Sequence, residues 1–373
     1  MLLTDISFLT SRKREALYAR IASAPKLLTR FSSGALPCCC HRSNLSCLRQ
    51  ASGIACIRAN PVGSGQKSFG TRPVCMSHFP AIIPTPMALV SGHHDPVDAI
   101  LAHHGVSGPW QELPATGIAN RIYATDDIVL RIAVDCSEAL EDARTESVAA
   151  PVALSAGVRV PRLISFNDSG TFTNRAYSLW ERIHGETLGF FAPDPRSCPA
   201  TWRAVGHQLA LLHNRVHDCI DPYGWLDHPA RDLHLEERIA SLAATSDIES
   251  TLVRKLELSA KALRPAVEGT LAVRFLHNDV HAMNLMCARD GTLLALLDWG
   301  DAGWGDPVLE LAQVPLAAVP FVLQGYESEA HLDNAAEARM LWDKLCGEVE
   351  QFEKRRLYGR SLENLLARIS RIA

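Results

Sequence analysis

Two apolar runs joined by a tight turn, with polar residues at their far ends, constrain this chain more than any other feature. The runs are residues 285–288 and 293–297, and an Asp-Gly pair lies between them at 290–291. Asp-Gly is a strong signal for a two-residue hairpin turn, because both residues tolerate positive φ. Pairing outward from this turn brings Asn284 opposite the end of the second run, next to Asp298. The sequence therefore predicts a β-hairpin that carries Asn284 and Asp298 to the same end.

A third polar residue can reach this end of the hairpin. Asp279 lies five residues before Asn284, in a loop that can fold back toward it. Two carboxylates and an amide oxygen form a site of hard oxygen ligands, which magnesium prefers together with water and phosphate oxygens. Asp279 need not bind a metal, since its carboxylate can instead accept the proton of an attacking hydroxyl. These three residues form the candidate chemical centre of the chain.

The order of the predicted elements indicates an α+β protein with two lobes. β-rich sequence comes first and helical sequence later, apart from a β insertion near residues 275–298. The clearest helix covers residues 200–217, where apolar residues recur every three or four positions. The other expected helices are 96–104, 137–156 (interrupted at Pro151) and 235–263. The expected strands are 121–124, 128–132, 158–165 (broken at Pro161) and 176–183.

Charge divides the chain into two unlike parts. The 373 residues carry a formal net charge of −4, but residues 1–86 carry +9 and the remainder −13. Residues 1–86 also hold eleven serines and six of the eleven cysteines. This Arg-rich, Ser-rich and acid-poor composition is typical of an organelle transit peptide, and it also fits a disordered basic arm or translated sequence upstream of the true start. We therefore expect residues 1–86 to lie outside the catalytic part.

Composition also narrows the partners that we expect. The longest late apolar run, residues 314–323, is only ten residues long and contains two prolines, whereas a membrane span needs about twenty residues. The near-neutral overall charge gives no support to nucleic-acid binding. Cysteines after residue 86 are scattered without disulfide or metal spacing. We expect a cytoplasmic protein with no membrane or nucleic-acid partner, unless residues 1–86 direct it to an organelle.

Two motifs resemble those of a known fold. Residues 277–284 read HNDVHAMN and resemble the H-x-D-x-x-x-x-N catalytic loop of the protein-kinase-like fold. Residues 298–300, Asp-Trp-Gly, resemble its D-F-G motif. His281 and the run DWGDAGWGDP at 298–307 point to one branch, the aminoglycoside phosphotransferase family with its choline-kinase-like relatives. The resemblance implies a small β-rich N-lobe over residues 95–185 and a larger α-helical C-lobe over residues 186–373, preceded by a poorly structured segment.

The resemblance also implies roles for individual residues around the phosphates. Asp279 would be the catalytic base, and Asn284 and Asp298 would hold Mg²⁺ against the phosphates of ATP or GTP. Arg131 stands where the third N-lobe strand of the family usually ends in lysine, and Glu146 would be its ion-pair partner.

By the same resemblance, residues 176–183 would be the hinge, where backbone groups meet the nucleotide base. We expect Trp180, Glu181 and Arg182 to contribute to this part of the nucleotide site, chiefly through backbone groups.

The function implied is that of a small-molecule kinase, which transfers the γ-phosphate to a substrate hydroxyl. Residues 307–372 would shape the acceptor pocket, and the charge of −13 suits a cationic acceptor. The alternative is a nucleotide-binding pseudokinase or interaction module, because Arg131 replaces lysine and residues 113–123 contain a single glycine. A protein kinase is disfavoured, because a Gly-rich loop and an Ala-Pro-Glu segment are absent from the sequence.

Other polar residues near these motifs have simpler interpretations. We expect His277 to brace the catalytic loop, and His281 either to face substrate or merely to pack. Asp306, which precedes Pro307, is expected to cap a short helix. A metal-hydrolase interpretation of the H-x-D-x-H spacing at 277–281 is disfavoured, because no further ligands follow at a suitable spacing.

Overall fold

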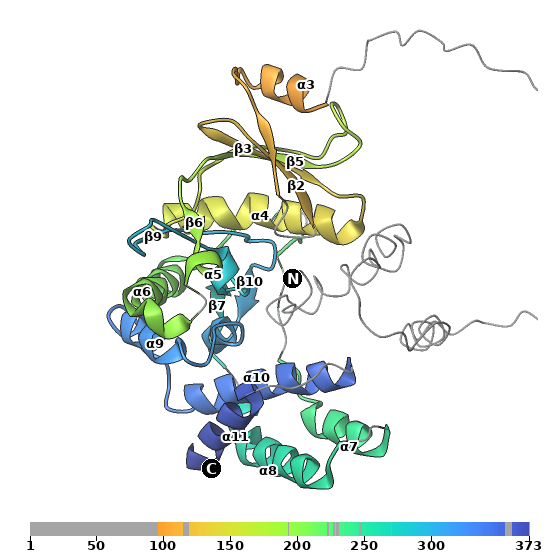
Figure 1. The fold of residues 1–373 in the computed structure, drawn as a ribbon, viewed down its shortest axis with the longest axis vertical. Helices are drawn as coiled ribbons and strands as arrows, with labels where there is room; N and C mark the ends of the chain where they lie inside the picture. The colour runs from red at the N-terminus through yellow and green to blue at the C-terminus, as the bar shows by residue number, and fades with distance from the viewer. Residues whose placement is uncertain are drawn as a thin grey trace, which may run out of the picture. The chain divides into compact units, whose positions relative to one another are not determined.

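The computed structural model describes residues 96–372, except 115–118, 193, 222–223, 227, 229–230, 246–247, 270 and 355–359. The expectations for residues 1–86 therefore lie outside the described residues. Within them, an antiparallel sheet forms an N-lobe and helices form most of a C-lobe (Figure 1). This is the two-lobed α+β arrangement that the sequence predicts. No helix in these ranges is long and apolar enough to cross a membrane.

The N-lobe is built on five antiparallel strands in the order β1-β2-β3-β5-β4. The strands are β1 (Gln111–Leu113), β2 (Asn120–Ala124), β3 (Ile128–Ala133), β4 (Leu163–Asn167) and β5 (Tyr177–Glu181). Tyr123 pairs with Leu130, and Leu130 pairs with Leu179, so three apolar side chains lie across one face of the sheet. Helix α3 (Pro96–His103) packs on this face in the same apolar cluster. Because side chains alternate along a strand, Arg131 faces the opposite side.

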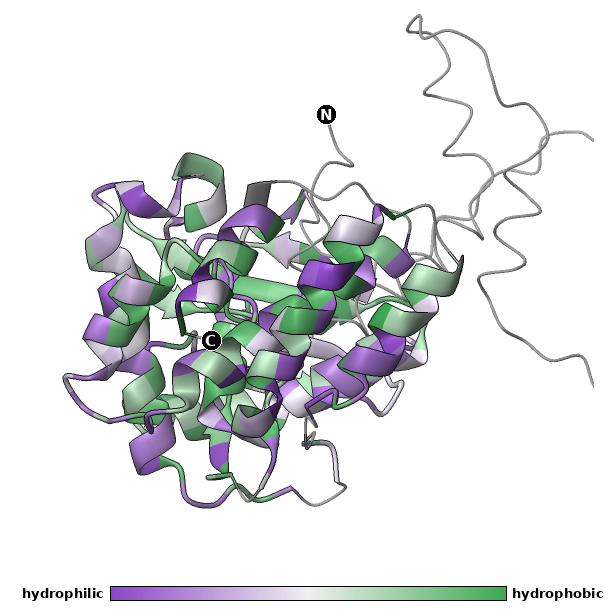
Figure 2. Ribbon diagram, turned by 90° about the horizontal axis from the view of Figure 1, so that it is seen from below, coloured by the Kyte–Doolittle hydropathy of each residue, from purple (hydrophilic) through white to green (hydrophobic). Residues whose placement is uncertain are grey.

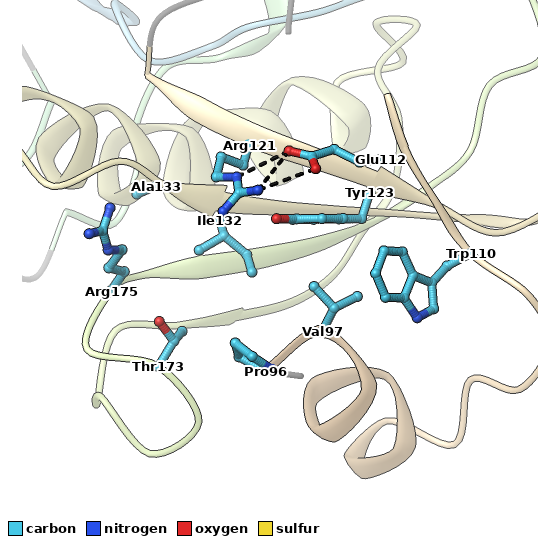
Figure 3. Close-up of a pocket in the computed structure, with 10 residues that line it drawn as sticks. All are labelled: Pro96, Val97, Trp110, Glu112, Arg121, Tyr123, Ile132, Ala133, Thr173 and Arg175. Carbon is cyan, nitrogen blue, oxygen red and sulfur yellow. Dashed lines mark hydrogen bonds and ion pairs between the residues drawn. The ribbon is translucent and has the colours of Figure 1, made fainter. Parts of the chain in front are cut away.

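A cavity of about 420 Å³ lies on the α3 side of this sheet. Trp110 and Tyr123 form an aromatic wall, and Arg121 pairs with Glu112 at its edge (Figure 3). Since Arg131 faces the other side of the sheet, this cavity is separate from the polar residues that the motifs single out.

Helix α4 (Ser137–Ser155) covers the other face of the sheet and passes through Pro151 without ending (Figure 1). The predicted interruption is therefore wrong. A proline inside a helix removes one backbone hydrogen bond and costs about 3 kcal/mol. Ala149, Ala150 and Ala153, which flank it, are fully buried. Packing of this alanine-rich face explains why the helix continues.

Helices dominate the C-lobe, as the sequence predicts. They are α5 (Leu188–Phe191), α6 (Pro199–Arg215), α7 (Leu235–Thr245), α8 (Ser250–Val267), α9 (Val319–Tyr326), α10 (Ala336–Glu353) and α11 (Arg360–Ile372). In Figure 2 hydrophobic and hydrophilic residues alternate along the helical ribbons, as expected for helices around a shared core. The single helix expected over residues 235–263 is instead two helices, α7 and α8.

Two glycines allow α6 and α9 to cross closely. A β-carbon on Gly206 of α6 would collide with the backbone oxygen of Val322, and one on Gly325 of α9 would collide with that of Arg203. Backbone atoms cannot move aside as a flexible side chain can, so the crossing requires glycine at both positions.

The β insertion of the C-lobe contains four short strands, whereas the sequence predicts only the two strands of the hairpin. They are β7 (Arg274–Leu276), β8 (Leu285–Cys287), β9 (Leu293–Leu296) and β10 (Gly303–Gly305). β7 pairs with β10. β8 and β9 form the predicted hairpin, and β8 also pairs with a short strand, β6 (Glu186–Thr187).

The hairpin turn differs from the prediction, yet the register at its far end agrees. Gly291 N donates to Ala288 O and Gly291 has φ +83°, so a longer loop with a left-handed glycine replaces the two-residue turn. The resulting shift of one residue is absorbed by a bulge between Met286 and Cys287. Leu297 N consequently donates to Asn284 O at 2.9 Å, as the predicted pairing requires.

In the N-lobe, the strand expected over residues 158–165 is also displaced. β4 begins at Leu163, after Pro161, and runs to Asn167. Val158 and Val160 are buried outside this strand, in the main core cluster. Proline lacks the N–H that a ladder needs, which explains the late start.

Candidate active site

The loop of residues 277–284, the candidate catalytic loop, begins where β7 ends and is held by a buried carboxylate. Glu310, in the short helix η4 (Pro307–Leu311), accepts hydrogen bonds from His277 N at 2.6 Å and Asn278 N at 2.9 Å. Asn278 has φ +64°, a left-handed conformation that is uncommon for residues other than glycine. The Glu310 carboxylate thus stabilises the bend that turns the chain toward Asp279.

His277 connects the catalytic loop to the end of β9. Its Nε2 lies 3.0 Å from Leu297 O, its Nδ1 accepts from Asp279 N at 3.3 Å, and its ring lies 4.5 Å from that of Trp299. Both ring nitrogens therefore contact backbone groups, which agrees with a bracing role. Within the described ranges, no group of three or more His, Cys, Asp or Glu side chains is arranged to hold a metal ion.

Asp279 and Asn284 lie together, as expected if the loop between them folds back toward the hairpin. Asn284 Nδ2 donates to Asp279 Oδ2 and to Asp279 O, each at 3.0 Å, and both side chains are buried. Because both contacts use the amide nitrogen, they orient the Asn284 amide oxygen away from Asp279. An oxygen oriented in this way is a suitable ligand for a hard cation.

Asp298 is joined to the N-lobe through Arg131. Arg131 Nη1 donates to Glu146 Oε1 at 2.6 Å and to Oε2 at 2.7 Å, while its Nη2 lies 3.6 Å from Asp298 Oδ1. The N–H of Trp299, the residue after Asp298, points at Glu146 Oε1 at 3.4 Å. One guanidinium therefore connects strand β3, helix α4 and the Asp-Trp-Gly segment.

Asp298 also has an unusual backbone and a tight neighbour. It adopts φ +66°. Its side chain is 33% exposed, in contrast to that of Glu146 at 6%. Gly300, two residues later, lies so close to Asp142 of α4 that an added β-carbon would be 2.8 Å from Asp142 Cβ. The segment therefore passes directly against α4 while leaving the Asp298 carboxylate accessible.

Burial and neighbouring charges shift the pKa values of Arg131 and Glu146. Burial by itself lowers the pKa of Arg131, but the Glu146 and Asp298 carboxylates outweigh this effect and raise the pKa. Burial also raises the pKa of Glu146, and the Arg131 guanidinium acts in the opposite direction. The guanidinium therefore stays charged beside the carboxylate of Asp298.

Residues 110–342 match the family model described as the phosphotransferase enzyme family. The chain belongs to this family. No curated protein sequence matches the chain.

Solved structures of similar fold agree with this membership. A choline/ethanolamine kinase family protein from Mesorhizobium loti aligns with TM-score 0.50 and 17% identity, covering 74% of this chain and 94% of that protein. The GDP complex of aminoglycoside 2'-phosphotransferase-IIIa aligns with TM-score 0.51 and 16% identity, covering 75% of this chain and 98% of that protein. These similarities show the fold, which is the protein-kinase-like fold expected from the motifs.

The predicted hinge of this phosphotransferase, residues 176–183, contains strand β5. Trp180 is buried and its Nε1 donates to Ser178 Oγ. Glu181 N donates to Arg162 O at 2.9 Å, and Arg182 N donates to Asp127 O at 2.8 Å. Since these two N–H groups are engaged, a nucleotide contact from Glu181 or Arg182 would have to use other atoms.

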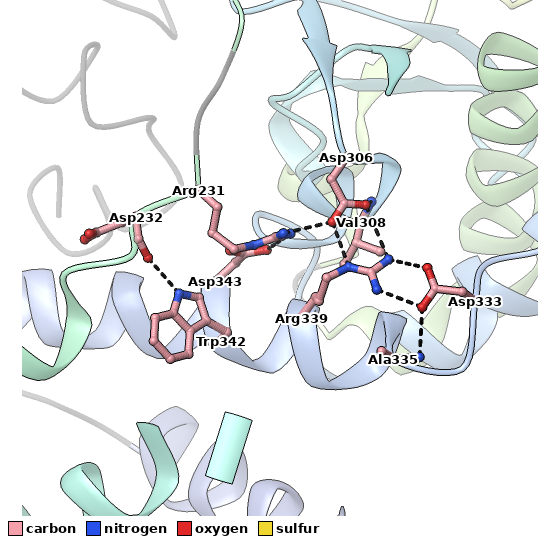
Figure 4. A network of polar contacts seen from close by, with 9 residues as sticks. All are labelled: Arg231, Asp232, Asp306, Val308, Asp333, Ala335, Arg339, Trp342 and Asp343. Atoms are coloured by element: carbon pink, nitrogen blue, oxygen red, sulfur yellow. Dashed lines mark hydrogen bonds and ion pairs between the residues drawn. The ribbon is translucent and has the colours of Figure 1, made fainter. Parts of the chain in front are cut away.

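Asp306 caps η4, as predicted, and also belongs to a buried ionic network (Figure 4). Its side chain accepts from Val308 N at 3.1 Å. Arg339 Nε lies 2.8 Å from Asp306 Oδ2, and Arg231 Nη1 lies 2.9 Å from the same oxygen. Arg231 also pairs with Asp343 of α10 at 2.7 Å. The network attaches the segment after Asp298 to helix α10.

Sequence reasoning missed Glu310 and the two arginines of this network. Glu310 accepts a hydrogen bond from His277, 33 positions earlier in the chain. Arg339 donates one to Asp306, which is also 33 positions away. A glutamate inside a short apolar helix, between Leu309 and Leu311, is the one local signal that this carboxylate is buried for a reason.

Proposed function

We propose that this protein is a small-molecule kinase that transfers the γ-phosphate of ATP or GTP to a hydroxyl group of its acceptor. The observation that carries this proposal is the buried Asp279 carboxylate held 3.0 Å from Asn284 Nδ2, beside the chain of contacts from Asp298 through Arg131 to Glu146. A positioned base and a polar phosphate site are the two parts that phosphoryl transfer requires.

Asp279 is the proposed base. Its carboxylate accepts the proton of the acceptor hydroxyl as the oxygen of that hydroxyl forms a bond to the γ-phosphorus and the bond to the β-phosphate oxygen breaks. The nucleoside diphosphate leaves with the electrons of that bond. A positioned base of this kind typically contributes about 10²–10⁴-fold to the rate.

Asn284 and Asp298 are the proposed ligands of Mg²⁺. The donor set fits this ion, because one amide oxygen is oriented away from Asp279 and one carboxylate is partly exposed, and Mg²⁺ commonly uses one or two protein oxygens. The bound ion would neutralise charge on the nucleotide phosphates. Arg131 adds a positive charge next to Asp298 and is the proposed contact of the N-lobe with the phosphates.

The proposed nucleotide and acceptor classes have separate support. The solved aminoglycoside 2'-phosphotransferase-IIIa structure is a GDP complex, which supports a nucleotide co-substrate for a chain of this fold. Its name also supports a small hydroxyl-bearing acceptor. The charge of −13 over residues 87–373 favours an acceptor that is cationic.

The test is nucleotide turnover over a panel of hydroxyl acceptors, with ATP and with GTP, comparing wild type with Asp279→Asn. We expect Asp279→Asn to lower turnover by about 10²–10⁴-fold. The exposed Asp218, changed in the same way, should leave turnover unchanged. Equal turnover by wild type and Asp279→Asn would remove Asp279 from the mechanism.

A thermal-shift measurement separates the kinase from a pseudokinase. Mg-ATP should raise the melting temperature of both wild type and Asp279→Asn, because the base does not hold the phosphates in this assignment. Stabilisation by nucleotide without transfer to any acceptor would favour the pseudokinase or interaction module.

We also propose that the catalytic part lies within residues 95–373. A chain lacking residues 1–86 should then retain its nucleotide turnover, since the motifs lie beyond this segment. Loss of turnover in a folded truncated chain would contradict this division.

A further inference from the structure

His281 lies on the catalytic loop and its imidazole contacts the proposed base. Its Nε2 is 3.5 Å from Asp279 Oδ2, and the imidazole is 6% exposed. Asn284 Nδ2 donates to the same carboxylate oxygen at 3.0 Å. Two side chains of one loop therefore contact Asp279 Oδ2.

The other ring nitrogen of His281 defines which nitrogen carries the proton. Nδ1 accepts a hydrogen bond from Met283 N at 3.2 Å, which caps the short helix η3 (Ala282–Asn284). An acceptor nitrogen has no proton, so the neutral ring carries its proton on Nε2. This proton lies on the side of the ring that faces Asp279 Oδ2.

We propose that His281 is a positioning residue for Asp279, an inference that rests on the proposed function. The Nε2–H of His281 and the amide of Asn284 together hold Oδ2, and so restrict rotation of the carboxylate that receives the acceptor proton. The distance of 3.5 Å is long for a hydrogen bond, but contacts of catalytic groups commonly shorten when substrate binds.

This arrangement assigns His281 no proton-transfer step. With Nδ1 occupied by the Met283 N–H and Nε2 already protonated, the ring has no free lone pair to take a proton from Asp279. A side chain that offers the same N–H at the same place should therefore replace it. This expectation distinguishes positioning from a proton relay.

Two amide substitutions separate the two contacts of the ring. His281→Gln places an N–H about as far along the side chain as Nε2, and so retains the donor to Asp279 but loses the cap on Met283 N. His281→Asn places an acceptor oxygen at the position of Nδ1, and so retains the cap but cannot reach Asp279. Asparagine is also a favoured N-cap residue.

Steady-state kinetics on the full chain provide the first readout. We expect His281→Asn to lower kcat about tenfold or more, with KM for the nucleotide unchanged, because a misplaced base slows only the chemical step. His281→Gln should keep kcat within about threefold of wild type and lower the melting temperature by a few degrees, because a cap is lost. Equal kcat in His281→Asn and wild type would overturn the proposal. Equal loss in both variants, with folding intact, would also overturn it.

The ¹⁵N NMR spectrum of labelled histidine side chains provides a second readout, which needs no acceptor substrate. The two signals of His281 are assigned by their loss in His281→Gln. The proposal expects the proton on Nε2 and a displaced Nε2 signal in Asp279→Asn. A proton on Nδ1, or an unmoved signal, would overturn the positioning role. Failure of the proposed function gives a different result from failure of the positioning role. In that case wild type and Asp279→Asn would show equal turnover.

Discussion

Arg131 and Glu146 form a largely buried ion pair in which one guanidinium nitrogen lies 2.6 Å and 2.7 Å from the two carboxylate oxygens. We expect Glu146→Gln to lower the free energy of unfolding by about 3 kcal/mol, since it leaves the largely buried guanidinium with a weaker partner. The exposed pair Arg121–Glu112 is the control, and Glu112→Gln should cost less than about 1 kcal/mol. Urea denaturation measures both, and equal losses would contradict the difference in burial.

Glu310 should affect catalysis without touching substrate. Glu310→Gln retains one acceptor oxygen but places an NH₂ group against one of the two backbone N–H donors, His277 N or Asn278 N. We expect a loss of about 1–3 kcal/mol in stability and a lower kcat, because the bend before Asp279 is no longer held. The exposed Glu327→Gln is the control. A fully active Glu310→Gln enzyme would show that the loop holds its shape by other means.

Asp306 and Asp333 both pair with Arg339, at 2.8 Å and 2.6 Å, but they differ in burial. The Asp306 side chain is 4% exposed and that of Asp333 is 59% exposed. Asp306→Ala leaves two buried arginines without a shared carboxylate, so we expect a loss of about 3–5 kcal/mol. Asp333→Ala should cost about 1 kcal/mol or less, because solvent screens an exposed pair. Denaturation curves of the two variants would be superimposable if burial did not matter.

Gly206 and Gly347 test the helix crossing. Gly206→Ala forces a β-carbon onto the Val322 backbone oxygen, and we expect it to cost about 1–3 kcal/mol or more. Gly347, inside α10, has open space at the same position, so Gly347→Ala should stabilise the protein by about 0.5–1 kcal/mol. If the melting temperatures of Gly206→Ala and Gly347→Ala both rose relative to wild type, the close approach of α6 and α9 would be contradicted.

Lys344 should make stability depend on pH. Burial lowers the pKa of Lys344 to about 7, while its Nζ donates to Ala312 O and Val314 O. An unfolded lysine titrates near pH 10.4, so between about pH 7 and pH 10 the unfolded chain holds a proton that the folded chain lacks. The free energy of unfolding should therefore rise with pH across this window, by up to about 1.4 kcal/mol per unit.

The variant Lys344→Met should lack this rise, whatever its stability at pH 7. Urea denaturation at pH 7, 8 and 9 measures the slope, with the exposed Lys255→Met as control. Parallel slopes in wild type and Lys344→Met would show that another group titrates in this range.

The sequence alone was sufficient for features that depend on near neighbours in the chain. The alternating and helical patterns predicted the two lobes, and the apolar runs around residues 290–291 predicted that Asn284 and Asp298 share one end of a hairpin. The catalytic motifs indicate the fold, and the fold implies the pairing of Arg131 with Glu146 that the structure contains. Such patterns act over a few residues, or through a recognised motif, so they can be read before the chain is folded.

Tertiary structure decided which distant groups those residues meet. Pro151 stays inside α4 because buried alanines pack around it, and a bulge restores the hairpin register that a different turn had shifted. Glu310 reaches the catalytic loop from 33 residues away, and His281 faces Asp279 because η3 orients its ring. A buried polar group must find its partner wherever packing brings one, and the linear spacing of residues does not record that distance.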